Sequence, residues 1–246
     1  MTPYYEDDFV RLFNYDCREL LPTCGEYDHV ITDPPYDAET HANARTAATA
    51  DIGKAAGVLD IKFTSLGDPT WLVKALTPRR WALACCSREL LGDYRRASGD
   101  RWIRSGIWDR VGGAPQFTGD RPGQAVEGIA IWHREGKKRW NRGGKRGIWR
   151  HPVVNGPERV HETQKPVSLM RELILDFTDP DETIFDPFAG SGTTGVAAKE
   201  CGRKAVLVEI DEARCVIAAK RLVEASLDER ITRVPGVRGK QGALAW

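Results

Sequence analysis

Short apolar runs alternate along the chain with segments whose apolar positions recur every three or four residues. The apolar runs predict buried strands at 9–13, 29–32, 81–86, 129–132, 183–185 and 205–208. The other pattern predicts helices at 69–76, 89–96, 166–177, from about 193 to 201, and at 211–225. Strands that alternate with helices predict an α/β fold with a doubly wound, mostly parallel sheet.

Several element boundaries carry residues with known terminal preferences. Pro166 stands in the first turn of one predicted helix, and Gly202 follows the next one. Asp211 is expected to cap the last helix. The two prolines at 34–35 cannot continue a hydrogen-bonded ladder, so the strand at 29–32 is expected to end there.

Two long segments lack this alternation. Residues 37–68 are rich in Ala, Thr, Gly and Asp and predict a long loop, of a kind that is often functional in a compact domain. Residues 101–160 intersperse tryptophans with Gly and Arg. We therefore predict a single domain over residues 1–228, with 37–68 and 101–160 as insertions and 229–246 as a basic, flexible tail.

The composition fits a chain with a sizeable core and without a membrane segment. The chain has 246 residues, of which 41% are hydrophobic. No run of about 18 apolar residues is present. The acidic N-terminal sequence, MTPYYEDDFV, lacks the apolar core of a signal peptide. We expect a cytoplasmic protein of prokaryotic or phage origin with no membrane contact.

The six cysteines and five histidines do not form a metal-binding pattern. No cysteine pair has the CxxC spacing, and the histidines have no HxxxH spacing. We therefore expect reduced, structural thiols and no metal site.

Positive charge gathers in one stretch, although the whole chain carries a net charge of only +1. Residues 132–150 hold three tryptophans, four glycines and eight cations, which are Arg134, Lys137, Lys138, Arg139, Arg142, Lys145, Arg146 and Arg150. Cations for phosphates and aromatic rings for unstacked bases are typical of nucleic-acid binding. The alternative is a solvated hairpin whose tryptophans pack on the core.

A glycine-rich loop follows the strand predicted at 183–185. The sequence GSGTTG at 190–195 fits the pattern G-x-G-x-x-G, and Glu209 follows Gly190 by 19 positions, at the end of the next strand. Glycines let the backbone approach a ligand closely, and the carboxylate can accept the hydroxyls of a ribose. The pattern predicts a site for an adenosine-containing cofactor. A glycine turn used only for strand–helix packing is the alternative.

Two features argue against a nicotinamide dinucleotide as that cofactor. Only 37 residues follow Glu209, too few for the second half of a six-stranded dinucleotide-binding fold. Asp186 lies just before the loop, where its charge would repel a pyrophosphate but would suit an ammonium group. A nicotinamide-dependent reductase stays a rival hypothesis, which a binding test with NAD would decide.

Three motifs together resemble one enzyme family. The sequence DPPY stands at 33–36, HETQKP at 161–166 and DPFAGSGTT at 186–194. Their combination and order resemble the β class of DNA amino-methyltransferases, over residues from about 9 to 222. The resemblance implies a Rossmann-like fold that depends on S-adenosyl-L-methionine (AdoMet). Its seven-stranded, mostly parallel sheet would contain one antiparallel hairpin member.

The resemblance also implies a reaction, the transfer of a methyl group from AdoMet to N6 of a flipped-out adenine in DNA. Such an amine is a poor nucleophile because its lone pair is delocalised into the ring. Asp33 and the Pro34 carbonyl would accept its two hydrogens, and Tyr36 would stack on the base. The catalytic residues implied are Asp33, Pro34, Pro35 and Tyr36. N4 of cytosine is the first alternative target, and a non-catalytic module that holds AdoMet and DNA is an alternative of another class.

The cofactor residues follow from the same resemblance. Asp186, Phe188 and the first two loop glycines would surround the methionine part, Glu209 the ribose and Ile210 the adenine. Thr163 and Lys165 would reach the carboxylate of the cofactor. The full set is Asp16, Cys17, Asp33, His161, Thr163, Lys165, Pro166, Asp186, Pro187, Phe188, Gly190, Ser191, Gly192, Thr193, Glu209 and Ile210. For Asp16, a helix cap for residues 18–21 is the alternative.

DNA is the partner that the resemblance implies. We expect residues 37–68 and 101–160 to contact DNA and to recognise the target, with the eight cations of 132–150 on phosphates or guanine edges. A homodimer and a cognate restriction endonuclease are further expectations, since the chain shows no separate target-recognition domain.

Overall fold

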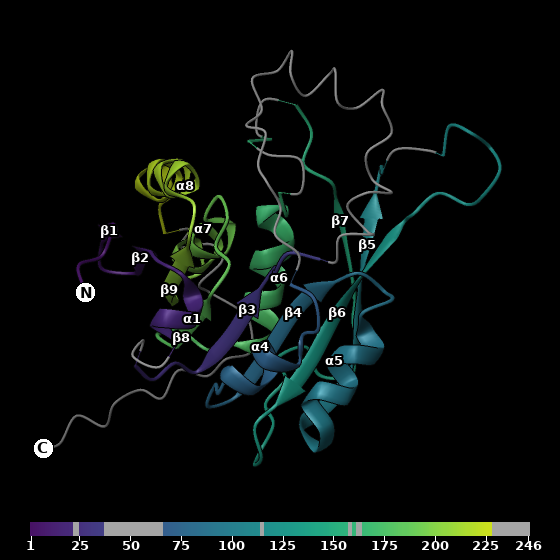
Figure 1. Cartoon of the computed structure of the whole chain (residues 1–246), viewed down its shortest axis with the longest axis horizontal. Helices are drawn as coiled ribbons and strands as arrows, with labels where there is room; N and C mark the ends of the chain where they lie inside the picture. Colours follow the sequence, from purple (N-terminus) through teal and green to yellow (C-terminus); the bar gives the residue numbers. More distant parts are fainter. Residues whose placement is uncertain (22–24, 37–65, 114–115, 157–158, 161–163, 228–246) are drawn as a thin grey trace, which may run out of the picture.

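The computed structural model describes residues 1–21, 25–36, 66–113, 116–156, 159–160 and 164–227 (Figure 1). Among these residues, nine strands form one sheet in the order β1-β2-β9-β8-β3-β4-β6-β5-β7. The strands are β1 (Tyr5–Glu6), β2 (Val10–Asn14), β3 (His29–Thr32), β4 (Trp81–Cys86), β5 (Trp102–Val111), β6 (Val126–His133), β7 (Ile148–Pro152), β8 (Thr183–Asp186) and β9 (Lys204–Glu209). The α/β fold is confirmed. The sheet differs from the expected seven strands because β1 and β7 extend it at its two sides.

Most strands run in the same direction, so most of them finish at the same end of the sheet. Parallel pairing joins β2, β9, β8, β3 and β4, and it also joins β5 to β7. Strand β6 is antiparallel to its neighbours β4 and β5, as expected for one hairpin member, and β1 is antiparallel to β2. Seven strands therefore end at one end of the sheet, here called the carboxyl end, where β6 begins. The opposite end is called the amino end.

Helices cover both faces of this sheet. They are α1 (Cys17–Leu20), α4 (Thr70–Ala75), α5 (Leu91–Ser98), α6 (Val167–Phe177), α7 (Thr193–Glu200) and α8 (Glu212–Glu224), with the 3-10 turn η1 (Gly99–Arg101). Successive strand residues face opposite sides, so the core is divided in two. Ile31 of β3 shares one apolar cluster with Leu173 of α6, whereas Val30 shares the other with Leu72 of α4. Figure 1 shows α4 and α5 on the near side of the sheet and α6 on the far side.

The predicted helix boundaries are largely confirmed. Asp211 caps α8, because its side chain accepts a hydrogen bond of 2.8 Å from the Ala213 amide. Gly202 follows α7 with a φ of 67°, a left-handed conformation that favours glycine. Pro166 stands at the N-cap of α6. No helix in the described ranges is long and apolar enough to cross a membrane.

Residues 101–160 are not an insertion, contrary to our expectation. They supply β5, β6 and β7 to the main sheet, and the connections 112–125 and 134–147 join these strands. Trp108, Trp132 and Trp149 are at most 3% exposed, so they are core residues of these strands. The expectation that the tryptophans stack on bases is therefore wrong for Trp132 and Trp149. Residues 37–65 and 229–246, expected to form a loop and a tail, lie outside the described residues.

Candidate active site

The motif residues gather at the carboxyl end of the sheet. Asp33 follows β3, Asp186 ends β8 and Glu209 ends β9. Strands β3, β8 and β9 are consecutive and parallel, so their ends are neighbours. In open α/β sheets, ligands bind at this end.

Glu209 is hydrogen-bonded to the backbone of the glycine loop. Its Oε2 accepts from the Gly190 amide at 2.8 Å, and its Oε1 accepts from the Asp211 amide at 3.0 Å. The side chain is buried, and burial raises the pKa of its carboxyl group. Each oxygen keeps a second lone pair, which can accept a hydroxyl of a ligand.

Asp186 is the second buried carboxylate at this end. Its Oδ1 accepts from the Thr32 hydroxyl at 2.7 Å and from the Phe188 amide at 3.1 Å. Burial raises the pKa of Asp186 to about 6. The bond from Thr32 connects the β3 end, where the DPPY motif starts, to the strand that carries the glycine loop.

The packing alternative for the loop glycines has structural support. Gly190 and Gly192 have φ angles of 55° and 77°, and a Cβ on Gly192 would lie 2.9 Å from that of Ala218 in α8. A Cβ on Gly195 would lie only 2.5 Å from Leu207 Cδ1 in β9. Gly192 thus permits close packing against α8, and Gly195 permits close helix–strand packing.

The Ser191 and Thr193 side chains do not face an empty site. The Arg221 guanidinium donates to the Ser191 hydroxyl at 2.8 Å, to the Ser191 carbonyl at 2.7 Å and to the Thr193 hydroxyl at 3.1 Å. These bonds fix the two side chains, and each hydroxyl keeps its own O–H donor.

The DPPY motif and Lys165 form one buried cluster. The Lys165 ammonium donates to the Asp33 carboxylate at 2.8 Å and to the Tyr36 hydroxyl at 3.1 Å. A third partner is Glu127 of β6, whose Oε2 lies 3.2 Å from Lys165 Nζ and accepts from the Tyr36 hydroxyl at 2.7 Å. The expected partner of Lys165 was a cofactor carboxylate, but its three N–H groups are already shared among protein acceptors.

The charged groups of Asp33, Lys165 and Glu127 shift one another's pKa values. Burial raises the pKa of Asp33, and the Lys165 charge opposes that rise. Burial alone would lower the pKa of Lys165, but Asp33 and Glu127 raise it well above its ordinary value. Burial would likewise raise the pKa of Glu127, but Lys165 and Arg110 lower it. Lys165 is therefore an ammonium, and it favours the ionised form of Asp33.

Glu127 and Arg110 were missed by sequence reasoning. Glu127 stands in the apolar sequence VEGIAIWH at 126–133. A carboxylate inside such a strand is costly unless it is paired, and this was the available signal.

Asp16 and Cys17 lie beside the end of β9, because Asn14 is paired with Glu209 in the sheet. The alternative for Asp16 is confirmed, since it caps α1 by accepting from the Arg18 amide at 2.9 Å. Burial raises the pKa of the Cys17 thiol to about 11. Ile210 is 67% exposed next to Glu209, so its side chain is available to a ligand. His161 and Thr163 lie outside the described residues.

Comparison with known proteins identifies the family. The family model of N6/N4 DNA methylases matches residues 97–220, about half of the chain. The chain belongs to this family. It is a methyltransferase of the N6-adenine/N4-cytosine DNA class, a class that uses AdoMet.

Individual methylases are similar over most of the chain. The type II methyltransferase M.HinfI of Haemophilus influenzae is 27% identical over 89% of this chain and 70% of its own length. The type II methyltransferase M2.LlaDCHI of Lactococcus lactis subsp. cremoris is 26% identical over 89% of this chain and 91% of its own.

Solved structures share the fold. The complex of M1.HpyAVI with SAM has a TM-score of 0.65 at 24% identity and covers 87% of this chain and 100% of its own. The cytosine-N4-specific PvuII DNA methyltransferase has a TM-score of 0.64 at 16% identity and covers 94% of this chain and 98% of its own.

Most of the basic stretch of this methylase does not lie near Asp33. Strand β6 begins at the carboxyl end and finishes at the amino end, where the Arg134 amide donates to the Arg80 carbonyl before β4. Arg134, Lys137, Lys138 and Arg139 therefore follow β6 at the amino end. Arg142 pairs there with Glu172 and Asp176 of α6.

Lys145 and Arg146 are exposed residues of the connection that leads back to β7. Arg150 is the member of the stretch that stands on a strand in the carboxyl half of the sheet, where it pairs with Asp109 at 2.9 Å.

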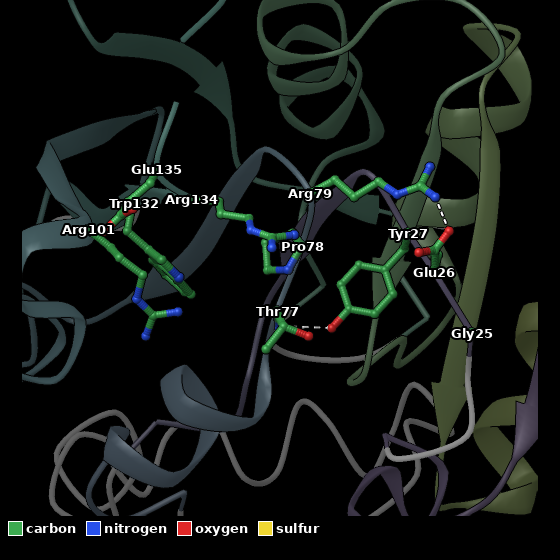
Figure 2. A pocket seen from close by; sticks show the side chains of 10 residues that line it. All are labelled: Gly25, Glu26, Tyr27, Thr77, Pro78, Arg79, Arg101, Trp132, Arg134 and Glu135. Atoms are coloured by element: carbon green, nitrogen blue, oxygen red, sulfur yellow. Dashed lines mark hydrogen bonds and ion pairs between the residues drawn. The ribbon is translucent and has the colours of Figure 1, made fainter. Parts of the chain in front are cut away.

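A cavity of about 520 Å³ also opens at the amino end of the methylase (Figure 2). Figure 2 shows Tyr27 and Arg79 on one side, where Tyr27 accepts a hydrogen bond from the Thr77 amide and Arg79 pairs with Glu26. Trp132 and Arg101 stand on the other side. This cavity is separated from Asp33 by the length of the strands, so it is not the catalytic site.

Metal ligands do not cluster in the part of the chain that the structure describes. No group of three or more His, Cys, Asp or Glu side chains among those residues could hold a metal ion.

Proposed function

We propose that the chain transfers a methyl group from AdoMet to the exocyclic N6 of adenine in DNA. One observation carries the proposal. Thr32 donates to Asp186 at 2.7 Å, and the next residue, Asp33, is bound to Lys165 at 2.8 Å. The acceptor for a target amine and the glycine loop for a cofactor are thus held together by adjacent strand ends.

The carboxyl end fits the chemical groups of AdoMet. The Glu209 carboxylate has free lone pairs for the ribose hydroxyls, and Ile210 offers exposed apolar surface for the adenine. Asp186 supplies a negative charge for the ammonium group. We assign Pro187, Phe188 and the backbone of residues 190–193 to the methionine part of the cofactor. Asp16 and Cys17, next to Glu209, complete the adenine side.

Lys165 takes a different role from the one expected. Its ammonium is bound to Asp33, Tyr36 and Glu127. In the proposed site it holds the catalytic motif, and Pro166 fixes the start of α6 directly behind it. The carboxylate of the cofactor must be bound by other groups.

The DPPY motif activates the target amine. Bound AdoMet supplies an electrophilic methyl group. Asp33 and the Pro34 carbonyl accept the two amine hydrogens, which directs the nitrogen lone pair toward that methyl group. As the N–C bond forms, the C–S electron pair stays on sulfur, and Asp33 accepts the proton that the nitrogen must lose. Pro35 and Tyr36 contact the base, which is flipped out of the duplex because its amine is unreachable inside the stack.

Adenine is favoured over cytosine by the first residue of the motif, since Asp rather than Ser stands at 33. N4 of cytosine is the second candidate, and the fold shared with the cytosine-N4-specific PvuII enzyme supports keeping it. A nucleoside digest decides between them. Unmethylated genomic DNA is incubated with the chain and AdoMet, and the deoxynucleosides are identified by mass spectrometry. N6-methyldeoxyadenosine is expected. N4-methyldeoxycytidine would change the base, and no methylated nucleoside would overturn the proposal.

DNA is proposed to approach the carboxyl end. Figure 1 shows the connection between β5 and β6 at this end, so residues 116–125 take over the role first given to the whole of 101–160. A homodimer, a cognate restriction endonuclease and a cytoplasmic location stay predictions.

A further inference from the structure

Glu127 brings a second acidic group to the DPPY motif. It is the second residue of β6 and lies opposite Trp108 of β5. Its Oε2 accepts from the Tyr36 hydroxyl at 2.7 Å and lies 3.2 Å from Lys165 Nζ. Its Oε1 lies 3.3 Å from an Arg110 guanidinium nitrogen. The Glu127 side chain is 11% exposed and that of Lys165 is 6% exposed, so water does not replace these contacts.

The fold itself does not require a carboxylate at this position. Residues 129 and 131, on the same face of β6, are isoleucines of the core. An apolar residue at 127 would continue that pattern, and no charge would then need Lys165 and Arg110 to neutralise it. A buried ion pair is weak evidence for a gain in stability, so another role must be considered.

Glu127 determines which acceptors the Lys165 ammonium and the Tyr36 hydroxyl use. Lys165 has three N–H groups, and Glu127 takes one of them, while Asp33 and Tyr36 take the others. Glu127 also accepts the Tyr36 hydroxyl hydrogen, although the Tyr36 hydroxyl oxygen lies 3.3 Å from Asp33 Oδ1 and could donate there instead. Without Glu127, the Tyr36 hydroxyl would donate to Asp33 as Lys165 already does, so fewer of the roughly four lone pairs of the Asp33 carboxylate would be left for the target amine.

We infer that Glu127 is a positioning residue for methyl transfer, which fixes the Tyr36 ring and draws donors away from Asp33 so that Asp33 can accept a hydrogen of the target amine. The inference rests on the proposed function of the DPPY motif. Glu127 acts through Tyr36 and Lys165, and it is not itself required to touch the base.

The rival role for Glu127 is structural, as an anchor for Arg110 on the β5–β6 hairpin. The two roles differ in the pH profile of kcat. Asp33 must be ionised to accept, and its pKa responds to Lys165 on the segment before α6, to Glu127 on β6 and to Tyr36. Cys85 on β4 and Asp186 on β8 also interact with Asp33, and Cys85 interacts with Glu127 as well. Glu127 raises the pKa of Asp33, so removal of the Glu127 charge lowers that pKa. The acid limb of the kcat profile then moves to lower pH.

The test uses the full chain with Glu127→Gln and Glu127→Leu, and Glu135→Gln, an exposed residue after β6, as the matched control. Glu127→Gln retains an acceptor oxygen, so we expect kcat within roughly tenfold of the parent and an acid limb at lower pH. Glu127→Leu loses the acceptor, and we expect kcat to fall by roughly 100-fold while the KM for AdoMet stays within about threefold. Glu135→Gln should match the parent chain.

One outcome would contradict the proposed function, and another would contradict only the role inferred for Glu127. A parent chain that methylates neither adenine nor cytosine would overturn the proposed function. A parent chain that is active, with Glu127→Leu equal to it in kcat and pH profile, would overturn the inference alone.

A third measurement does not depend on turnover. The Tyr36 hydroxyl donates to Glu127 Oε2 at 2.7 Å. The chemical shift of the Tyr36 ring carbon that bears the hydroxyl, followed by NMR in a ¹³C-tyrosine sample, should change in Glu127→Leu, because the hydroxyl loses this acceptor. An unchanged chemical shift would show that Glu127 does not hold Tyr36.

Discussion

The Lys165 ammonium lies 2.8 Å from the Asp33 carboxylate, although 132 positions separate the two residues along the chain. This ion pair joins the segment before α6 to the end of β3. It also determines which groups are free to bind a substrate, because Lys165 is committed to the catalytic motif.

Asp33→Ala should abolish most methyl transfer. The substitution removes an acceptor for the target amine, and the loss of one such group at a reacting centre costs roughly 10²–10³ in kcat. Transfer of labelled methyl groups to DNA measures the effect, and AdoMet binding should persist. Asp100→Asn, an exposed change at the amino end, is the control. Near-normal turnover of the Ala variant would refute the role given to Asp33.

AdoMet affinity should rise with pH until Asp186 is ionised. The pKa of Asp186 is raised to about 6 by burial, so below that pH the carboxyl group is mostly neutral and attracts the ligand ammonium weakly. We expect affinity at pH 5 to be about tenfold lower than at pH 7. Calorimetric titration at several pH values measures this. Asp186→Asn should bind weakly at every pH, and a pH step that survives in that variant would belong to another group, such as Glu209.

Gly195→Ala should destabilise the fold. A Cβ at 195 would lie 2.5 Å from Leu207 Cδ1, so the α7–β9 packing must shift. Overpacking of this kind costs about 1–3 kcal/mol in the free energy of unfolding. Thermal or urea unfolding measures the loss. Gly144→Ala is the control, since a Cβ there has no atom within 4 Å. Equal stability of the two variants would contradict the packing argument.

Simultaneous replacement of Lys137, Lys138 and Arg139 by Ala should leave binding of a short target duplex nearly unchanged. These residues follow β6 at the amino end, and the six residues of β4 place roughly 17 Å between the two ends of the sheet. The salt dependence of DNA binding should also stay the same, because few phosphate contacts are lost. Fluorescence anisotropy at several salt concentrations measures both quantities. A weaker complex with a flatter salt slope would show that DNA reaches the amino end.

The sequence by itself determined six of the nine strands in the described residues, the helices α4 to α8 and the motifs that they carry. Apolar periodicity is a local property, so β3, β4, β8 and β9 were predicted within one or two residues. Local chemistry also predicted the cap at Asp211 and offered a cap as the alternative role of Asp16. The motif DPPY, the glycine loop and Glu209 were recognisable because their functions depend on residue type at the end of a strand.

The tertiary structure alone decided which of these residues meet. The antiparallel course of β6 takes the residues after it to the amino end, so most of the basic stretch lies away from Asp33. The same strand carries Glu127 to Tyr36, 91 positions away, a contact that depends on strand pairing and has no local signature. Trp132 and Trp149 are buried in the core, and a tryptophan that fills the core cannot also stack on a base.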